Sequence, residues 1–361
     1  MPRAKLTNIK IRGYRSIREC SVELHDVNVL IGPNGAGKSN FISSFSLIQS
    51  ILSHNLQITA SRCGISAMLY NGMKTTRSIL MEATFGENSY GFVLEPTDDQ
   101  RMMFAEEYFK WNRVENKSVI ERGHFESVWE KGAGNGIDGY VVPVLDARAW
   151  RVYHFHDTTR SSGMKQAHDL HDNAFLLQNA ENIAPFLLRL KNEFPKAYSR
   201  IVNTVRMVAP LFDDFFLEPN ESNDTVVLRW KKRGYDGVMG PNQFSDGTLR
   251  FVCLAVLLLQ PTKLMPETII LDEPELGLYP QAMVYLSEML HSAGEKKQVI
   301  VSTQSADLVD DFSPEDIILV EDRGDGSVFR RVDTDSLKEW LEDDYFLGLL
   351  WKKNLLSGDD R

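Results

Sequence analysis

Hydrophobic and polar residues alternate through the first part of the chain. The alternation runs over residues 6–12 and 21–24, and a continuous apolar run follows at 27–31. Alternation predicts a strand with one buried face, whereas a short apolar run predicts a strand buried on both faces. Residues 6–31 are therefore predicted to form three strands, the last of them inside the molecule.

The period of the pattern changes in the middle of the chain. Alternation returns over 78–94 and again at 139–144, which predicts an antiparallel β-lobe with a charged hairpin around 97–137. Apolar residues then recur at helical spacings across 167–209, which predicts helices. A second hairpin is predicted over 215–230.

The last third of the chain switches repeatedly between helical and strand patterns. Helices are expected at 249–260 and 280–293, and strands at 268–272, 298–302 and 316–320. Such alternation of helices with buried strands is typical of an α/β fold.

A glycine-rich loop, Gly-Pro-Asn-Gly-Ala-Gly-Lys-Ser at 32–39, lies between the buried strand and a predicted helix that reaches Leu52. Strand, G-x-x-x-x-G-K-S and helix, in this order, form the phosphate-binding loop of P-loop NTPases. Its backbone N–H groups would face the phosphates, Lys38 would reach the β- and γ-phosphates, and Ser39 would hold Mg²⁺. The contacts to ATP are expected from Asn34, Gly35, Ala36, Gly37, Lys38, Ser39 and Asn40.

Two adjacent acids end the apolar strand predicted at 268–272. An acid at this end of a buried strand is where a P-loop NTPase places an Mg²⁺ ligand, so Asp272 is the candidate. Glu273 would then orient or deprotonate the attacking water. Two acids at an ordinary exit from a strand are the alternative.

Four stretches together resemble the ABC-type ATPases, in the branch that contains the SMC, RecF and OLD-like proteins. They are residues 9–17 (opening strand), 244–250 (signature motif), 272–280 (Walker B and D-loop) and 299–305 (switch strand). They come in the order of that family and span most of the chain. The closer similarity is to the bacterial ATPases labelled "AAA family", which share stretches like 153–158 and 345–354.

The resemblance implies a fold and a domain organisation. The fold class would be α/β: a P-loop NTPase of ABC-ATPase head type, with a mixed sheet flanked by helices, an antiparallel β-lobe and an inserted helical lobe. Residues 1–361 would form a single head. Its parts would be a nucleotide-binding part (1–60), the β-lobe (61–153), the helical lobe (154–245) and a C-terminal α/β part with Walker B and the switch (246–361).

The resemblance also implies how the ATP site is completed. Two heads, or a higher oligomer, would sandwich ATP head to tail, with Ser245 and Gly247 of one copy completing the phosphate loop of the other. A hydroxyl residue and a glycine before a helix suit an anion. The tetrapeptide Ser-Asp-Gly-Thr at 245–248 also suits an ordinary helix cap, and this alternative stays open.

Two positions depart from the family pattern. Asp246 stands where the family usually has Gly, and its negative charge would either weaken closure near a γ-phosphate or face away. Gln304 stands where many ABC enzymes have His, and it can hydrogen-bond the γ-phosphate but cannot relay a proton. With Glu273, Lys38 and Gln304 as the catalytic residues, hydrolysis is expected to be slow, which suits a switch more than a motor.

Residues 153–157, Tyr-His-Phe-His-Asp, allow three interpretations. His156 or Asp157 could be a metal ligand, since histidine and aspartate bind zinc and similar ions. The histidines could equally be ordinary surface or core residues. The stretch also lies where ABC heads place the Q-loop, which senses Mg²⁺ and water. Arg12 is likewise either a contact to the base or phosphate of ATP or an exposed strand arginine.

Composition restricts the partners and the compartment. The 40 basic and 50 acidic residues give a net charge of −10, which excludes a uniformly basic nucleic-acid coat but leaves room for a local basic groove. The three cysteines lie far apart and form neither a disulfide framework nor a zinc pattern. No stretch reaches the roughly 18 apolar residues of a membrane span, so a cytoplasmic protein without a membrane partner is expected.

The preferred function is a dimeric ATP switch for a separately encoded effector, a nuclease or a toxin, in phage defence or a toxin–antitoxin-like module. The 57 residues after Gln304 are too few for the Toprim nuclease domain of OLD-like enzymes. The main alternative is a RecF-like clamp on DNA in repair, with positive charge from Arg148, Arg151, Arg160 and 231–233. A transporter ATPase and a scaffold that binds ATP without hydrolysing it are less favoured.

Overall fold

The computed structural model describes residues 5–111, 116–132, 150–334, 337, 340, 345–353 and 355–356. The chain divides into two compact units. The first comprises Met1–Val152, Pro266–Ile270 and Ile300–Arg361, and the second comprises Tyr153–Met265 and Leu271–Val299. The strand predicted at 139–144 lies outside the described residues. In the part of the chain that is described, no helix is long and apolar enough to cross a membrane.

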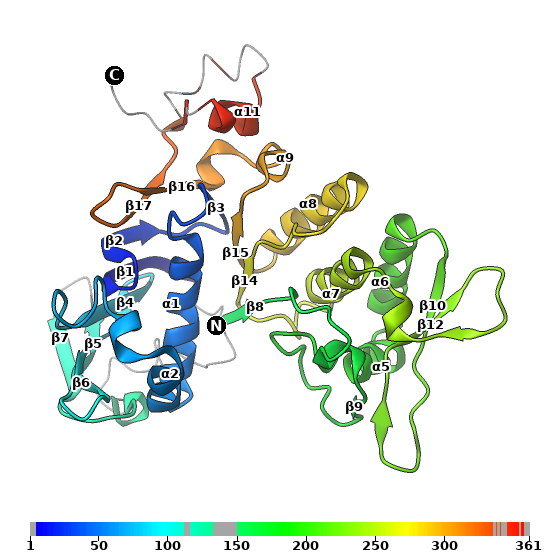
Figure 1. The fold of residues 1–361 in the computed structure, drawn as a ribbon, viewed down its shortest axis with the longest axis horizontal. Coiled ribbons are helices and arrows are strands. Elements are labelled where there is room, and N and C mark those ends of the chain that lie inside the picture. The colour runs from blue at the N-terminus through cyan, green and yellow to red at the C-terminus, as the bar shows by residue number, and fades with distance from the viewer. Residues whose placement is uncertain are drawn as a thin grey trace. The chain divides into compact units, whose positions relative to one another are not determined.

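The first unit contains two sheets and a long helix (Figure 1). Its strands are β1 (Leu6–Tyr14), β2 (Ile17–Glu23), β3 (Val27–Ile31), β4 (Ile79–Phe85), β5 (Asn88–Pro96), β6 (Met102–Trp111), β7 (Asn116–Glu121), β8 (Trp150–Tyr153), β14 (Thr268–Asp272), β15 (Gln298–Thr303), β16 (Ile317–Asp322) and β17 (Ser327–Arg331). Its helices are α1 (Lys38–Leu52), α2 (Leu56–Cys63), α3 (Ile65–Met68), α9 (Ala306–Val309) and α11 (Leu347–Lys352). Strands β8, β14 and β15 continue into the second unit at one end.

The antiparallel sheet has the strand order β2-β1-β4-β5-β6-β7. Alternate residues along β4 are buried, as the sequence pattern requires for a sheet with one face in the core. The three strands predicted in residues 6–31 are confirmed, and so is the antiparallel β-lobe. The predicted charged hairpin corresponds to the pairing of β6 with β7.

The second sheet is mixed, with the order β17-β16-β3-β15-β14-β8. β16 runs parallel to β3 and antiparallel to β17. β3, β14 and β15 are buried along nearly their whole length, which agrees with their continuous apolar runs. The phosphate loop leaves the end of β3, so a central strand of this sheet carries it.

The core of the first unit surrounds α1. Phe41, Phe45 and Ile48 of this helix are buried in one apolar cluster with residues of both sheets. Phe45 meets Trp150 edge to face, with ring centroids 6.5 Å apart, and Trp150 stacks on Phe85 at 5.2 Å. The helix that follows the phosphate loop is thus fixed by packing along its length, which also fixes its N-terminus.

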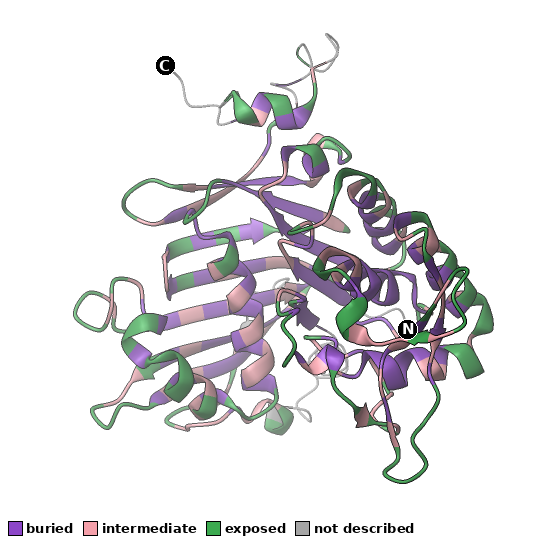
Figure 2. Ribbon diagram, turned by 45° about the vertical axis from the view of Figure 1, so that its right-hand side comes forward, coloured by how far each residue is buried: buried purple, intermediate pink, exposed green. Residues whose placement is uncertain are grey.

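The second unit combines helices with short strands. Its elements are β9 (His168–Asp169), α5 (Ile183–Glu193), α6 (Pro195–Val208), β10 (Phe212–Phe216), β11 (Thr225–Val226), β12 (Arg229–Lys232), β13 (Val238–Met239), α7 (Asp246–Leu259) and α8 (Pro280–Gly294). The hairpin predicted over 215–230 is confirmed by the pairing of β10 with β12. Every residue of α7 from Phe251 to its end is buried, and Figure 2 colours the buried residues of the whole chain purple. α7 is therefore the core helix of this unit.

The helical prediction for residues 167–209 is wrong in its first part. α5 begins only at Ile183, and turns precede it. Asn182 provides the reason, because its buried side chain makes three hydrogen bonds of 2.8–3.0 Å to backbone groups of residues 172–177. A side chain that satisfies backbone groups in this way stabilises turns at the expense of helix.

The carboxylate of Glu107 is buried in the β-lobe and collects several hydrogen bonds. Glu107 in β6 accepts hydrogen bonds from the Tyr90 hydroxyl at 2.6 Å, from the backbone N–H of Val128 at 2.9 Å and from the hydroxyl of Ser127. The ring nitrogen Nε2 of His124 lies 2.9 Å from the carboxylate oxygen that accepts from Val128, and the two hydroxyls donate to the other oxygen. Burial raises the pKa of Tyr90, so this hydroxyl remains a donor. Because a buried polar group without hydrogen-bond partners is costly, these bonds hold the 124–128 segment on the sheet.

We predict that Glu107→Ala lowers the free energy of unfolding by about 3–5 kcal/mol, because several buried polar groups lose their common acceptor. Unfolding in urea measures this. The matched control is Glu95→Ala on the exposed side of neighbouring β5, which should change stability by no more than about 0.5 kcal/mol. Equal effects of the two substitutions would contradict the structural role of Glu107.

Candidate functional site

The phosphate loop has the backbone that its glycines allow. Gly35 and Gly37 have φ of 82° and 111°, in the left-handed region that residues with a Cβ rarely adopt. Lys38 is buried, and its ammonium donates to the carbonyls of Gly32 at 2.6 Å and Pro33 at 3.1 Å. The cation is thereby positioned over the backbone of its own loop. Asn34, Gly35 and Ser39 are exposed, whereas Ala36 is buried and Asn40 is half-buried.

Residues distant in sequence support the loop from behind. The Ser16 hydroxyl lies 2.7 Å from that of Ser327 in β17 and accepts a hydrogen bond of 2.7 Å from the Asn40 amide. A Cβ on Gly37 would lie only 2.0 Å from the Ser327 hydroxyl oxygen. The loop is therefore clamped between the first hairpin and the last one, and Gly37 is required for close packing as well as for its backbone angle.

Gln304 directly follows β15 and is half-buried. The next residue, Ser305, caps the N-terminus of α9, since its hydroxyl accepts a hydrogen bond of 3.2 Å from the Leu308 N–H. The end of a buried strand and a capped helix thus fix the backbone on both sides of the predicted switch residue.

Asp272 and Glu273 lie in the second unit, at the end of β14. Glu273 has φ of 47°, which is uncommon for a residue with a Cβ and costs conformational energy. Such angles occur at sites where the surrounding structure holds a side chain in one direction. This backbone angle, together with the acidity of Glu273 and its position directly after β14, supports Glu273 as a functional candidate.

His156 is joined to the end of β14. Its Nε2 lies 2.9 Å from the Asp272 carbonyl oxygen, and since a carbonyl can only accept, Nε2 carries the proton. The adjacent Asp157 does not take part, because its carboxylate accepts from the N–H and the hydroxyl of Thr159 at 3.0 and 2.7 Å. These two bonds lower the pKa of Asp157 and keep it ionised.

Arg250 in α7 connects the elements around Asp272. One guanidinium nitrogen donates to the His156 carbonyl at 2.9 Å, and the other donates to the Leu276 carbonyl at 2.8 Å. His156, Arg250, Asp272 and Glu273 also line one small cavity of about 10 Å³, close to the volume that one water requires. The guanidinium therefore fixes both the 153–157 stretch and the 275–279 turn to the same helix.

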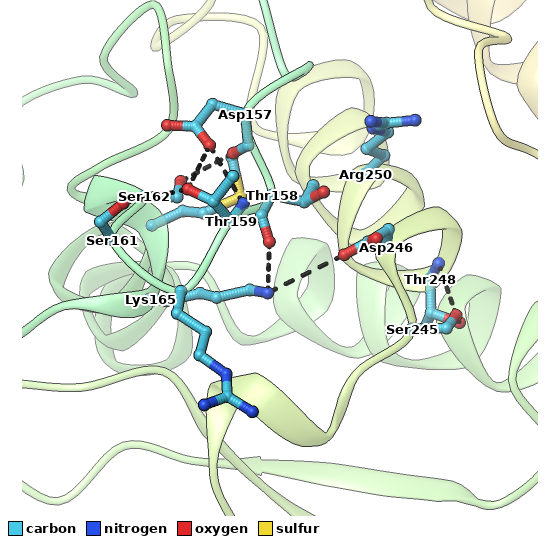
Figure 3. A network of polar contacts seen from close by, with 12 residues as sticks. Asp157, Thr158, Thr159, Ser161, Ser162, Lys165, Ser245, Asp246, Thr248 and Arg250 are labelled. Atoms are coloured by element: carbon cyan, nitrogen blue, oxygen red, sulfur yellow. Dashed lines mark hydrogen bonds and ion pairs between the residues drawn. The ribbon is translucent and has the colours of Figure 1, made fainter.

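Ser245 and Gly247 stand at the N-terminus of α7, and we call residues 245–247 the signature segment. The Ser245 hydroxyl accepts from the Thr248 N–H at 3.2 Å, so the helix-cap interpretation is realised in this structure (Figure 3). A Cβ on Gly247 would lie 2.4 Å from the Gly277 carbonyl oxygen. The glycine thus lets the signature segment and the 275–279 turn approach each other closely.

Arg12 is exposed on β1. It lines a cavity of about 530 Å³ together with Arg18, Tyr70 and Arg77, and no residue of the phosphate loop lines this cavity. Of the other basic residues proposed for DNA, Arg151 is buried, Arg160, Lys231 and Arg233 are exposed, and Arg148 lies outside the described residues.

No group of three histidine, cysteine, aspartate or glutamate side chains that could hold a metal occurs among the residues with described positions. The ligands expected for Mg²⁺, Ser39 and Asp272, offer hydroxyl and carboxylate oxygens, which are the donors that this hard cation prefers. The metal interpretation of His156 or Asp157 gains no third ligand from the described part of the chain.

Two residues that the sequence did not single out are central to the site. Arg250 was visible as a charged side chain within the otherwise apolar stretch 249–259, which is a signal that could have been used. Lys165 carried no such signal, because an isolated lysine between turns is ordinary. Its position beside Asp246 emerges only from the fold.

Two family models match the chain. One, described as "AAA ATPase domain", matches residues 5–120. The other, described as "AAA domain, putative AbiEii toxin, Type IV TA system", matches residues 140–310. The first range includes the phosphate loop, and the second includes Asp272 and the signature segment.

Curated relatives are similar over different lengths. Old nuclease of Escherichia phage P2 is 23% identical over 376 residues, which cover 93% of this chain and 62% of that protein. A "Putative ABC transporter ATP-binding protein" of Methanosarcina acetivorans is 32% identical over 83 residues, which cover 23% of this chain and 29% of that protein. The chain therefore spans less than two thirds of either relative.

Solved structures of SMC heads share the fold. An SMC head bound to the C-terminal winged-helix domain of ScpA superposes with a TM-score of 0.57 at 14% identity, covering 91% of this chain and 98% of that one. An SMC head with an extended coiled coil, bound to the C-terminal domain of ScpA derived from Pyrococcus furiosus, gives 0.57 at 13% identity, covering 95% and 100%. The expected fold class, an α/β head of ABC-ATPase type, is confirmed.

We predict that Arg250→Leu lowers ATP hydrolysis at least about tenfold and stability by about 2–3 kcal/mol, because two charge-assisted hydrogen bonds to backbone carbonyls are lost. A steady-state ATPase assay and urea unfolding measure the two effects. Arg233→Leu, an exposed arginine of the same unit, is the control and should change neither. Wild-type hydrolysis by a folded Arg250→Leu protein would contradict the role assigned to the guanidinium.

Proposed function

We propose that this chain is an ATPase of the SMC and OLD-like type and acts as a slow, dimeric ATP switch that regulates a separately encoded effector. The effector would be a nuclease or a toxin in phage defence or a toxin–antitoxin-like module. Two copies would meet head to tail in the cytoplasm, with an ATP at each phosphate loop.

The proposed chemistry assigns one task to each residue. Lys38 binds the β- and γ-phosphates, and Ser39 and Asp272 hold Mg²⁺, which neutralises charge on the phosphates. Glu273 orients the attacking water and accepts its proton, and Gln304 hydrogen-bonds the γ-phosphate. The residues 34–40 supply backbone and side-chain contacts to ATP, and Arg12 remains a candidate for a further contact.

The observation that carries the switch is the pair of hydrogen bonds made by Arg250. They connect the 153–157 stretch, which touches the carbonyl of Asp272, with the helix that begins at the signature segment. A displacement of Asp272 when ATP binds or is hydrolysed would therefore be transmitted through these contacts to the signature segment, which would meet the second copy. We propose that these contacts couple the state of the nucleotide to dimer closure.

Slow turnover suits this role. Gln304 cannot relay a proton as histidine can, so product formation relies on Glu273 alone. A switch benefits from a long-lived closed state, whereas a motor requires rapid cycling.

The relatives support an effector of the nuclease or toxin type. The matching family model names an AbiEii toxin of a type IV toxin–antitoxin system, and the P2 relative is named as a nuclease. The similar SMC heads were solved with a bound ScpA domain. We infer that this head, too, acts on a bound protein partner.

A RecF-like clamp on DNA is the second candidate, and one observation favours it. Three arginines, Arg12, Arg18 and Arg77, surround the cavity of about 530 Å³ in a protein whose net charge is −10. DNA binding that strengthens with ATP and falls steeply with salt would favour the clamp over the switch.

We predict that Glu273→Gln retains ATP binding, lowers hydrolysis by about 100-fold or more, and accumulates as a dimer, because the water loses its base while the phosphate contacts remain. Light scattering after gel filtration with ATP and Mg²⁺ measures the dimer. Lys38→Ala is the control, and it should bind no ATP and stay monomeric. A Glu273→Gln protein that remains monomeric with ATP and Mg²⁺ would refute the sandwich mechanism.

We predict that the protein encoded by the neighbouring gene co-purifies with the Glu273→Gln variant when ATP is present. The Lys38→Ala variant should capture at least about tenfold less of that protein. The reason is that a nucleotide switch must bind its effector with different affinity in its two states. Co-expression followed by affinity capture with and without ATP measures the difference. Capture that is equal in all nucleotide conditions would argue against a switch.

A further inference from the structure

Lys165 is a buried cation next to the signature segment. Its side chain is 6% exposed, and its ammonium donates to the Thr158 carbonyl and lies 3.9 Å from a carboxylate oxygen of Asp246 (Figure 3). Asp246 itself is 68% exposed. The pair therefore joins a lysine held inside the unit to an acid on its surface.

The turn that carries Lys165 is held rigidly. The Ser162 hydroxyl donates to the Asp157 carbonyl at 2.7 Å, and the Lys165 N–H donates to the Ser162 carbonyl at 3.0 Å. Gly163 packs so closely on Glu181 that a Cβ would lie 2.6 Å from the Cβ of that glutamate. The ammonium is therefore held at a defined place beside the signature segment, 3.9 Å from the Asp246 carboxylate.

Asp246 faces two opposing electrostatic demands. It is the first residue of α7, where a carboxylate interacts favourably with the positive end of the helix dipole. The same helix end, with Ser245 as its cap, is the place where the proposed mechanism brings the triphosphate of a second copy. An uncompensated carboxylate there would repel that anion.

We propose that Lys165 is a positioning residue of the signature segment: its ammonium neutralises the Asp246 carboxylate and holds it to one side, so that Ser245 and the start of α7 can receive the triphosphate bound by a second copy. This inference rests on the proposed dimeric function. It explains how the chain carries an acid where the family usually has glycine. Because the Thr158 carbonyl is the other partner of Lys165, the same cation also ties the 157–162 turn to the signature segment.

The test is a double-mutant cycle on ATP hydrolysis. Lys165→Met should lower kcat about tenfold or more, with a smaller change in KM for ATP, because the repulsion acts on closure of the dimer and not on the phosphate loop of the same copy. Asp246→Asn alone provides the reference. Lys165→Met combined with Asp246→Asn should lie within about threefold of that reference, because the lysine acts through the carboxylate.

Lys196→Met, an exposed lysine on α6, is the matched control and should leave kcat unchanged. Melting temperatures identify any variant that fails to fold. If Lys165→Met does not fold, Lys165→Arg and Lys165→Gln replace it, and the charged variant should retain at least about tenfold more activity than the neutral one. Full activity of folded Lys165→Met or Lys165→Gln, or a double variant as impaired as Lys165→Met, would overturn the inference.

Ser245→Arg separates failure of this inference from failure of the proposed function. An arginine at the cap would block the approach of the second copy's nucleotide, so hydrolysis should be lost. If Ser245→Arg hydrolyses ATP normally, the signature assignment and the dimeric mechanism both fail. If Ser245→Arg is inactive while Lys165→Met is fully active, only the role of Lys165 fails.

Discussion

A guanidinium group donates hydrogen bonds from one rigid plane, and Arg250 uses this geometry to hold two loops on one helix. The bonds to His156 and Leu276 span partners 94 and 26 residues away in sequence. Lysine could supply the charge but not the planar fork. The helix that starts at the signature segment, the turn after Glu273 and the stretch beside Asp272 are consequently joined by hydrogen bonds within the second unit, and the proposed switch depends on these contacts.

In the first unit, the phosphate loop is likewise held by contacts with residues distant in sequence. Its glycines permit the backbone angles, but the position of the loop is set by contacts with Ser16 and Ser327 and by the buried helix α1. The first and last hairpins of the head therefore meet at the loop. A substitution in β17 can disturb nucleotide binding without touching a residue of the motif.

The expected effect of Asp246 in the signature segment depends on the charged residue beside it. In the sequence, Asp246 departs from the family pattern, and its charge would either weaken closure or face away. Beside Lys165 it becomes one half of a compensated pair that leaves the cap of α7 available. The electrostatic effect of a residue that departs from a motif thus depends on the charged side chains that the fold places near it.

Local features could be predicted from the amino-acid sequence alone: the phosphate loop between β3 and α1, the acids at the end of β14, the cap at Ser245 and most strands and helices. These follow from periodicity and from residues adjacent in the chain. Where a side chain overrode periodicity, as Asn182 does before α5, the prediction was wrong. The contacts of Ser16 with Ser327, 311 residues away, of Arg250 with His156, and of Lys165 with Asp246 became known only from the folded chain. The physical reason is that long-range polar contacts need two partners brought together by the packed core, and no local pattern encodes that choice.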